Sequence, residues 1–328
     1  MRIAFEELRA GFLRVLTKVG FTAEKAERCA RIFAGNSRDG IYSHGLNRFP
    51  GFIDYIEKGL VDIHADPFCF EAHGAIECWD GRSGPGVLNA ETCMNRAIEL
   101  AKIHGISCVA LRNTNHWMRG GTYGLQAADA GCISICFTNT MANMPPWGGT
   151  LPRLGNNPMV ISAPYPNGHV LLDMAMSQYS YGKMGMYKAA GEMLPYDGGF
   201  DTAGNLTKDP AAILESWRPL PIGLWKGAGL ALVLDLLASI LSKGQSTGQI
   251  TEAKYETGCS QVFICIYREE ETERLSLMNS IIGYTQTGAG GTGKPITYPG
   301  ENMLKTREQN MAEGIPVNED AWKKVQNL

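Results

Sequence analysis

Hydrophobic residues recur at every third or fourth position through the first sixty residues of the chain, which is the spacing of amphipathic helices. This spacing predicts one helix over residues 5–19 and a second that Thr22 caps at its N-terminus. A third helix is predicted over about residues 47–58, because Pro50 is tolerated in a first turn and Gly59 is a helix-ending residue. The first part of the chain is therefore predicted to be helical.

From about residue 70 the pattern changes to short apolar runs rich in β-branched residues, with helical stretches such as Leu88–His104 between several of them. The predicted strands are Ile106–Leu111, Ile133–Thr138, Met159–Ala163, Val170–Met174 and Gln261–Tyr267. Strands that alternate with helices are typical of α/β proteins. The pattern returns to helix from about Glu301, so helical segments are predicted at both ends of an α/β chain.

Composition and charge limit the classes of protein to which the chain can belong. At 328 residues, with 44% hydrophobic and 19% charged positions, it is predicted to be globular with a large core. A net charge of −3 argues against a nucleic-acid partner. The longest apolar run, Gly227–Leu241, contains Asp235 and is too short to span a bilayer. It is therefore predicted to be a buried core helix, and no membrane association is expected.

The nine cysteines are dispersed along the chain, and no CxxC motif occurs. This distribution predicts reduced thiols in a cytoplasmic protein rather than a disulfide framework. The six histidines include no HxxxH or HExxH motif, so no metal site is predicted from the sequence.

His44 and Arg48 stand four residues apart and are the most informative pair in the sequence. If this stretch is helical, both side chains lie on one helix face. An imidazole can exchange a proton near neutral pH, and a guanidinium can hold a carboxylate with two parallel hydrogen bonds. The pair therefore suits the reduction of a keto acid. The alternative is a helix start with a buried histidine and a surface arginine.

Two of the predicted strands end in polar clusters, Arg112–His116 and Thr138–Thr140. Binding sites of α/β sheets usually lie just beyond strand ends. The first cluster continues into the glycine-containing stretch Trp117–Gly124, so amides, an imidazole and flexible glycines are predicted to converge at one strand tip. His116 is therefore a second candidate for acid–base chemistry.

The segment Gly288–Gly293 matches the G-x-G-x-x-G pattern, and with Lys294 it matches most of a P-loop. Either motif needs a strand before it and a helix after it. Pro295 stands where a P-loop has serine or threonine, and Pro299 also prevents a helix there. The segment is therefore predicted to be a mobile loop, with a phosphate-handling enzyme as the alternative.

Several longer strings, taken together, indicate a family. They are Tyr42–Gly45 with Asn47–Pro50, Asn115–Gly121, Met144–Gly148, Leu154–Pro158, Leu172–Ser177 and Trp225–Gly227. Their order and spacing resemble the malate/L-lactate dehydrogenase family of the second, non-Rossmann type, which also includes ureidoglycolate dehydrogenases and imine reductases. The resemblance runs nearly end to end and is poor only over residues 269–299.

The resemblance implies a homodimer whose chains bind NAD(P)H on a mixed sheet with helices, without a Rossmann fold. It implies a helical subdomain made of residues 1–70 and about 300–328, beside an α/β subdomain of about residues 71–299. It also implies cofactor contacts in three places. These are His169, Val170, Leu171, Leu172, Asp173, Met174 and Ala175; Trp225 and Lys226; and Gly300, Glu301 and Asn302.

Several single residues refine the expected cofactor site. Lys226 stands at the predicted start of the Gly227–Leu241 helix, whose positive end can attract a phosphate. Tyr181 replaces an arginine of some relatives that could serve a 2′-phosphate, which favours NADH over NADPH. Arg119 is a further candidate for binding sugar hydroxyls or a cofactor phosphate. Asp201 is a candidate for the aspartate relay of some imine-reducing relatives.

The expected activity is hydride transfer from NADH to the ketone of a 2-keto acid. His44 is expected to give a proton to the developing alkoxide, and Arg48 to hold the carboxylate. His116 and Asn115 are expected to line the same pocket. The alternatives are a malate/L-lactate or ureidoglycolate-type dehydrogenase of the same family and, from another class, a non-catalytic small-acid binding protein.

Overall fold

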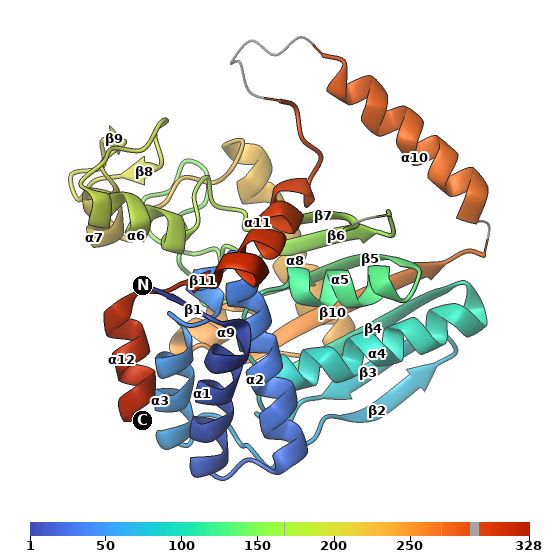
Figure 1. The fold of residues 1–328 in the computed structure, drawn as a ribbon. Helices are drawn as coiled ribbons and strands as arrows, with labels where there is room; N and C mark the ends of the chain where they lie inside the picture. The colour runs from blue at the N-terminus through green and yellow to red at the C-terminus, as the bar shows by residue number, and fades with distance from the viewer. Residues whose placement is uncertain (167, 270, 289–294) are drawn as a thin grey trace.

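The computed structural model describes residues 1–166, 168–269, 271–288 and 295–328. Its centre is a seven-stranded mixed sheet with the strand order β2-β3-β4-β10-β5-β6-β7 (Figure 1). β3 and β4 pair in parallel, and the other neighbours are antiparallel. β10 comes last in the sequence of these seven strands but lies between β4 and β5. The sheet is therefore complete only when this late segment inserts between strands formed much earlier in the chain.

The strands of this sheet are β2 (Phe68–His73), β3 (Ile76–Asp80), β4 (Ile106–Asn115), β5 (Cys132–Thr138), β6 (Met159–Ala163), β7 (Val170–Met174) and β10 (Thr257–Tyr267). Two short antiparallel pairs are β1 (Arg2–Ile3) with β11 (Ile315–Pro316) and β8 (Gly199–Phe200) with β9 (Leu206–Thr207). The helices are α1 (Phe5–Lys18), α2 (Ala23–Arg38), the 3₁₀ turn η1 (Tyr42–His44), α3 (Phe49–Glu57), α4 (Gly86–His104), α5 (Gly121–Asp129), α6 (Tyr181–Ala190), α7 (Pro210–Ser216), α8 (Trp225–Ser242), α9 (Thr247–Glu252), α10 (Glu271–Gln286), α11 (Glu301–Glu313) and α12 (Glu319–Asn327).

Helices cover both faces of the central sheet. α4 and α5 pack on one face, where Val109 and Phe263 belong to one buried cluster. α8 packs on the opposite face, where the neighbouring Ala110 and Val262 belong to a second cluster (Figure 1). Successive residues of a strand point to opposite faces, so two covered faces require the nearly continuous apolar runs of β4 and β10.

A bundle of α1, α2 and α3 packs around phenylalanine side chains beside the sheet. Phe12, Phe33 and Phe49 are fully buried, and the ring centroids of Phe12 and Phe49 are 4.3 Å apart. α12 packs on α1 and α3, and β1 pairs with β11, so both ends of the chain meet in this bundle (Figure 1). The subdomain boundaries near residues 70 and 300 stay a prediction.

One buried carboxylate joins this bundle to the rest of the chain. Asp39 follows α2, is 4% exposed, and accepts hydrogen bonds of 2.8 Å from Arg38, Arg119 and Arg307. Arg119 precedes α5, whereas Arg307 lies in α11. Burial alone would raise the pKa of Asp39, but the hydrogen bond from Arg307 and the charges of Arg119 and Arg38 lower it well below its ordinary value.

Most of the predicted elements are confirmed. The first two helices have the predicted positions, and Thr22 Oγ1 accepts a hydrogen bond from the Lys25 N–H at the start of α2. The third predicted helix is α3, which carries Pro50 in its first turn and ends before Gly59. β6 and β7 have the predicted bounds, and β5, β10, α4 and α11 lie where the pattern placed them.

Other predictions about elements are wrong or incomplete. β4 continues through the predicted polar cluster to Asn115, so only His116 of that cluster lies beyond the strand. The predicted Gly288–Lys294 loop lies outside the described residues, except for Gly288. β2 was not predicted because it is an edge strand with mostly exposed side chains and no alternation of apolar residues. β3, α6, α7, α9 and α10 were also not predicted, whereas α12 lies in the stretch after Glu301 that was predicted to be helical.

α8 is not the buried core helix that the sequence predicts. Small residues such as Ala231 and Ala238 face the sheet. The outer face carries large apolar side chains that are 41–68% exposed, namely Trp225, Leu232, Val233, Leu236, Leu237 and Ile240. By length and composition the helix could cross a membrane, although 33% of it is buried within the fold. Asp235 on the same helix accepts a hydrogen bond of 2.9 Å from Asn139 Nδ2.

We expect Asp39→Asn to lower the free energy of unfolding by about 3–5 kcal/mol, because three arginines lose their shared charge partner. Chemical denaturation followed by circular dichroism measures this loss. Glu6→Gln is a matched control, since the exposed pair of Glu6 with Arg9 should contribute less than about 1 kcal/mol. Equal stability of Asp39→Asn and the native protein at neutral pH would contradict the prediction.

The stabilisation by Asp39 should also depend on pH. The folded protein lowers the pKa of this carboxyl. Its contribution is therefore complete above the unfolded pKa of about 3.9 and is lost as the pH falls through the folded value. The free energy of unfolding of the native protein should fall more steeply below about pH 4 than that of Asp39→Asn.

Candidate active site

His44 ends the η1 turn that follows α2. At Gly45 the chain changes direction, and a Cβ there would lie 2.1 Å from Ser37 Oγ and 2.8 Å from Ser37 N, so only glycine fits. The Arg48 N–H donates to the Gly45 carbonyl, and Arg48 is the N-cap residue of α3. The expectation that His44 and Arg48 share a helix face is therefore wrong. The turn, not a helix, brings Arg48 close enough to affect the charge state of His44.

The imidazole of His44 stacks on that of His116, with ring centroids 5.9 Å apart and 14° between the planes. His116 directly follows β4, and its Nδ1 accepts a hydrogen bond of 2.9 Å from the Met118 N–H. His44 Nδ1 lies 2.9 Å from Ser43 Oγ. Each ring is thus held through Nδ1, and within the described part of the chain neither Nε2 atom has a hydrogen-bond partner. The structure therefore brings the two predicted histidines together with their Nε2 atoms available to a ligand.

Both imidazoles are neutral in this arrangement at neutral pH. Burial lowers the pKa of each ring from 6.5 to about 3, and the charge of Arg48 acts in the same direction. His116 and Arg119 also lower the pKa of His44. The hydrogen bond from Met118 requires a lone pair on His116 Nδ1, so the proton of the neutral His116 ring resides on Nε2.

Arg48 supplies a positive charge to this site and is 47% exposed. Its Nη2 lies 3.9 Å from Glu256 Oε2, which is an ion pair but too long for a hydrogen bond. Glu256 precedes β10, and the next residue, Thr257, pairs with Asn115. Glu256 and His116 therefore flank the same end of this antiparallel ladder. Glu256 was not identified from the sequence, because the predicted strand began only at residue 261 and the pairing of two distant strands leaves no signal in one sequence.

α6 and the loop before β6 lie beside the histidine pair. A Cβ on Gly182, in the first turn of α6, would lie 2.8 Å from the Cβ of Ser43. The Tyr181 hydroxyl donates a hydrogen bond of 2.5 Å to the Asn143 carbonyl. Tyr181 therefore connects α6 to the loop that also carries Trp147, which is 50% exposed.

Three other candidates, Asn115, Arg119 and Asp201, are engaged within the protein. Asn115 is buried, and its amide donates to backbone carbonyls of the turn before α4. Arg119 is buried against Asp39, so it is not available to sugar hydroxyls or a phosphate. Trp117 is buried in the core. The carboxylate of Asp201 accepts hydrogen bonds within the exposed β8–β9 turn, so its assignment as the relay is wrong.

The predicted cofactor segments at residues 169–175 and 300–302 lie side by side. The Leu171 N–H donates to the Pro299 carbonyl at 2.9 Å. Gly300 has a φ of +101°, and a Cβ there would lie 3.0 Å from the His169 carbonyl oxygen. β7 is the edge strand, and this hydrogen bond leaves the sheet on its open side. The backbone of Asp173, two residues later, points the same way, and no other backbone group among the described residues bonds to it on that side. This part of β7 can therefore bind an extended ligand.

Trp225 and Lys226 lie beyond the other end of β7. The Ile222 N–H, just before α8, donates to the Met176 carbonyl at 2.8 Å. Lys226 is exposed at the positive end of the 18-residue helix α8, and Trp225 is 64% exposed. Because a strand rises about 3.3 Å per residue, Leu171 and Met176 lie roughly 17 Å apart. The three predicted cofactor segments therefore follow one another along the edge of the sheet.

Side chains at three of these positions are engaged within the protein. His169 Nε2 lies 2.8 Å from Asp129 Oδ1, and Glu301 pairs with Lys305 at 2.8 Å. Asp173 accepts a hydrogen bond of 2.9 Å from the first N–H of α5. At these three positions the backbone groups, and not the side chains, are therefore the groups that a ligand would contact.

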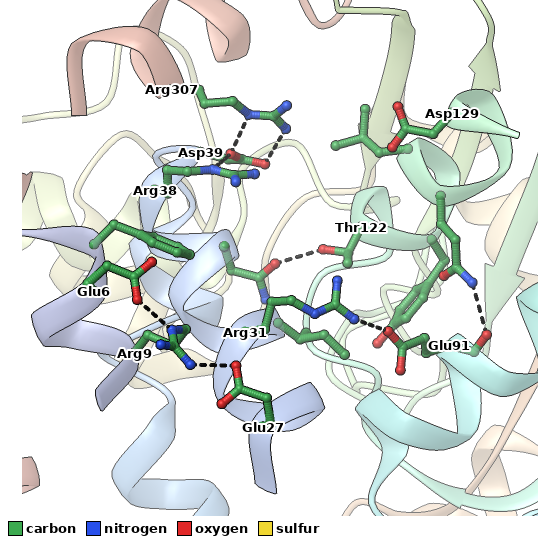
Figure 2. A pocket seen from close by; sticks show the side chains of 17 residues that line it. Glu6, Arg9, Glu27, Arg31, Arg38, Asp39, Glu91, Thr122, Asp129 and Arg307 are labelled. Carbon is green, nitrogen blue, oxygen red and sulfur yellow. Dashed lines mark hydrogen bonds and ion pairs between the residues drawn. The ribbon is translucent and has the colours of Figure 1, made fainter. Parts of the chain in front are cut away.

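A polar cavity of about 630 Å³ lies between α1, α2 and α5 (Figure 2). Its arginines are paired with its own carboxylates, as in Arg9 with Glu27 and Arg31 with Glu91. Neither histidine of the stacked pair lines it, and Arg48 does not line it either. In the described ranges no group of three or more histidine, cysteine, aspartate or glutamate side chains is placed to bind a metal ion.

Comparison with known proteins identifies the family. The family model described as malate/L-lactate dehydrogenase matches residues 3–326. The chain belongs to this family. It is therefore an oxidoreductase of keto or hydroxy acids in a family of NAD(P)-dependent dehydrogenases. The family indicated by the sequence motifs is confirmed.

Individual relatives of this dehydrogenase agree with the family assignment. The chain is 44% identical over 333 residues to proteins named 2,3-diketo-L-gulonate reductase from Citrobacter koseri and Escherichia coli, and the match covers 100% of each chain. A malate dehydrogenase from Entamoeba histolytica has a TM-score of 0.94 and 25% identity, covering 100% of this chain and 96% of that one. A sulfolactate dehydrogenase from Methanocaldococcus jannaschii has a TM-score of 0.89 and 28% identity with the same coverage. These matches confirm the predicted α/β fold class.

In the unliganded dehydrogenase we expect His116 to be uncharged at about pH 6, with its proton on Nε2, because burial lowers its pKa and Met118 occupies Nδ1. Long-range proton–nitrogen correlation spectra of histidine-labelled protein report both the charge and the tautomer. The exposed ring of His64 gives a comparison signal in the same sample. A charged His116, or a proton on its Nδ1 at neutral pH, would contradict this assignment.

Proposed function

We propose that this enzyme reduces the ketone of a 2-keto acid with NADH, and that its substrate is 2,3-diketo-L-gulonate. The observation that carries the proposal is the stacked pair of His44 and His116 beside the half-exposed Arg48. The substrate is supported by the names of the relatives at 44% identity, and by the same long motifs in the sequence. Malate, lactate or ureidoglycolate-type substrates are the alternatives within the family.

His44 is the proposed acid in the reduction. When bound, NADH supplies a hydride to the ketone carbon, and His44 Nε2 gives the proton that the alkoxide oxygen needs. Ser43 Oγ at Nδ1 fixes the orientation of the ring. His116 carries a proton on Nε2 without being charged, so it can donate a hydrogen bond to the carbonyl oxygen.

Arg48 is the proposed partner of the substrate carboxylate. Its guanidinium is half exposed and keeps its donors, because the nearest carboxylate is too distant for a hydrogen bond. A bidentate pair with the substrate would set which face of the ketone meets the cofactor. The negative charge of a bound substrate would also favour a proton on His44, because it offsets the charge that lowers the pKa of this imidazole.

We propose that NADH lies along the open edge of β7. The backbone of His169–Ala175 and of Gly300–Asn302 would bind ribose and amide groups, and Lys226 with the start of α8 would bind phosphate. Gly300 has a left-handed backbone conformation, and a Cβ there would approach the backbone of β7. A glycine at this position therefore lets the turn before α11 lie close against β7.

NADH is favoured over NADPH because Tyr181, which replaces the arginine of some relatives, donates a hydrogen bond to a backbone carbonyl.

We also propose a homodimer in the cytoplasm. The exposed apolar face of α8 supports the dimer, because a monomer rarely leaves so many large apolar side chains together in water. Nine free thiols, most of them buried, support a reducing compartment.

Oxidation of NADH and NADPH with a panel of acids tests the proposed function. The panel contains 2,3-diketo-L-gulonate, oxaloacetate, pyruvate and a cyclic imine. Turnover of diketogulonate with NADH supports the proposal. Turnover of another acid instead would support the proposed reaction but assign a different substrate. Folded protein that oxidises neither cofactor but binds NADH would contradict the proposed substrates, and protein that binds only acids would favour the non-catalytic alternative.

Two substitutions should separate proton transfer from carboxylate binding. His44→Ala is expected to lower kcat by about 10²-fold or more, because general acid catalysis contributes roughly 10²–10⁴-fold. Arg48→Lys is expected to raise KM for the keto acid by about tenfold, because lysine cannot make the paired contact. Steady-state kinetics, with NADH affinity measured by fluorescence as the control, test both. A His44→Ala enzyme with nearly full kcat, or an Arg48→Lys enzyme with unchanged KM, would contradict the assigned role.

Leu236→Glu should convert the dimer to a monomer, because it places a charge in the middle of the apolar face of α8. Multi-angle light scattering should give twice the 35.7 kDa chain mass for the native protein and about that mass for the variant. Ile103→Glu is the matched control, since Ile103 is equally apolar and 71% exposed but lies on α4, on the opposite face of the sheet. A monomeric native protein, or a Leu236→Glu variant that remains dimeric, would contradict this interface.

A further inference from the structure

A cation, Arg48, and a carboxylate, Glu256, lie together beside the histidine pair. Arg48 is the cation, because both imidazoles are neutral in the unliganded protein. The carboxylate is that of Glu256, whose side chain is only 13% exposed and whose Oε2 lies 3.9 Å from Arg48 Nη2. Glu256 has no part in the proton transfer or in the carboxylate binding proposed above.

The position of Glu256 is fixed from two sides. Thr257 pairs with Asn115 at the start of β10, so Glu256 lies just before one paired residue and His116 just after the other, at the same end of the β4–β10 ladder. The backbone of Met141 lies close enough to its carboxylate to favour the charged form. Burial is the largest influence and leaves the pKa of Glu256 raised, whereas the charge of Arg48 and the backbone of Met141 act in the opposite direction and favour the anion. The carboxylate therefore remains beside Arg48 without forming a direct hydrogen bond to it.

We propose that Glu256 is a specificity-determining residue that rejects keto acids with a second anionic group. This inference rests on the proposed function. A substrate that places its carboxylate on Arg48 and its ketone at His44 and His116 has the rest of its chain beside these groups, where Glu256 lies. A neutral, hydroxylated chain can donate hydrogen bonds to that carboxylate. A second carboxylate or a sulfonate meets a like charge in a partly desolvated site.

The net charge of the site supports the same selection. Arg48 and Glu256 sum to zero, so a bound monoanion brings the charge of these groups to −1 and a dianion brings it to −2. The dianion therefore leaves two negative charges, one of them that of Glu256, without a cationic partner. The names of the structural relatives, malate and sulfolactate dehydrogenase, refer to dianions, whereas diketogulonate is a monoanion.

Glu256→Gln tests the proposal, with the ratio of kcat/KM for oxaloacetate to kcat/KM for diketogulonate or pyruvate as the readout. We expect the native enzyme to favour the monoanion, and Glu256→Gln to raise the ratio by about tenfold, since a like charge a few ångströms away is removed. Glu256→Asp keeps the charge and should keep the native preference. An unchanged ratio in Glu256→Gln would overturn the proposal.

Glu252→Gln is the matched control, because it removes the same charge from an exposed position on α9, four residues earlier. It should leave the ratio unchanged. If both glutamines raise the ratio equally, the effect belongs to the net charge of the enzyme, and the assignment to Glu256 is overturned. Circular dichroism and thermal unfolding establish that each variant is folded.

A binding measurement separates this inference from the proposed function. Titration calorimetry with malonate as the dianion and oxamate as the monoanion requires no turnover. Glu256→Gln should gain about tenfold in malonate affinity relative to oxamate, whether or not the native enzyme reduces any acid of the panel. A relative gain without turnover would support the charge selection and reject the proposed reaction. Turnover without the gain would keep the reaction and reject Glu256 as the selecting residue.

Discussion

The pairing of β10 with β4 is the constraint on which both the fold and the candidate site depend. β10 fills the centre of the sheet and contributes Val262 and Phe263 to the two apolar clusters that hold helices on opposite faces. Its first residue, Thr257, pairs with Asn115. The same backbone ladder that completes the core therefore also brings Glu256 and His116 to the same end of two neighbouring strands. A change in this register would move the core side chains to the wrong face and separate the groups of the site.

Burial governs the electrostatics of the site. Two histidines placed beside an arginine would repel it and each other if they were charged. Burial removes this conflict because it lowers the pKa of both rings. In His116 the Met118 N–H also occupies Nδ1, the nitrogen that would otherwise take up a second proton. Arg48 remains charged and half exposed. The unliganded site is thus prepared for one carboxylate, and the charge of that ligand is what would favour protonation of His44.

The edge of the sheet and the outer face of α8 remain open in a single chain. The open edge of β7 is bordered by the Gly300 turn at one end and by the start of α8 at the other. α8 therefore links a candidate cofactor site, at its N-terminus, to an apolar face along its length. Its small inner residues allow a close approach to the sheet, and its large outer residues are left for another surface.

Periodicity in the sequence was sufficient for α1, α2, α3 and the central strands, because their apolar spacing reflects burial that is local to each element. The motifs around His44, His116 and Lys226 were sufficient for the family, because long strings of unusual residues are specific even in one sequence. The sequence alone could not reveal the stacking of His44 on His116, the burial of Arg119 against Asp39 or the position of Glu256. These depend on strand order and on pairing between distant segments, which leave no periodic signal along the chain. The exposed face of α8 was missed for a related reason: composition records that a helix is apolar, but only the tertiary structure decides how much of its surface the protein itself covers.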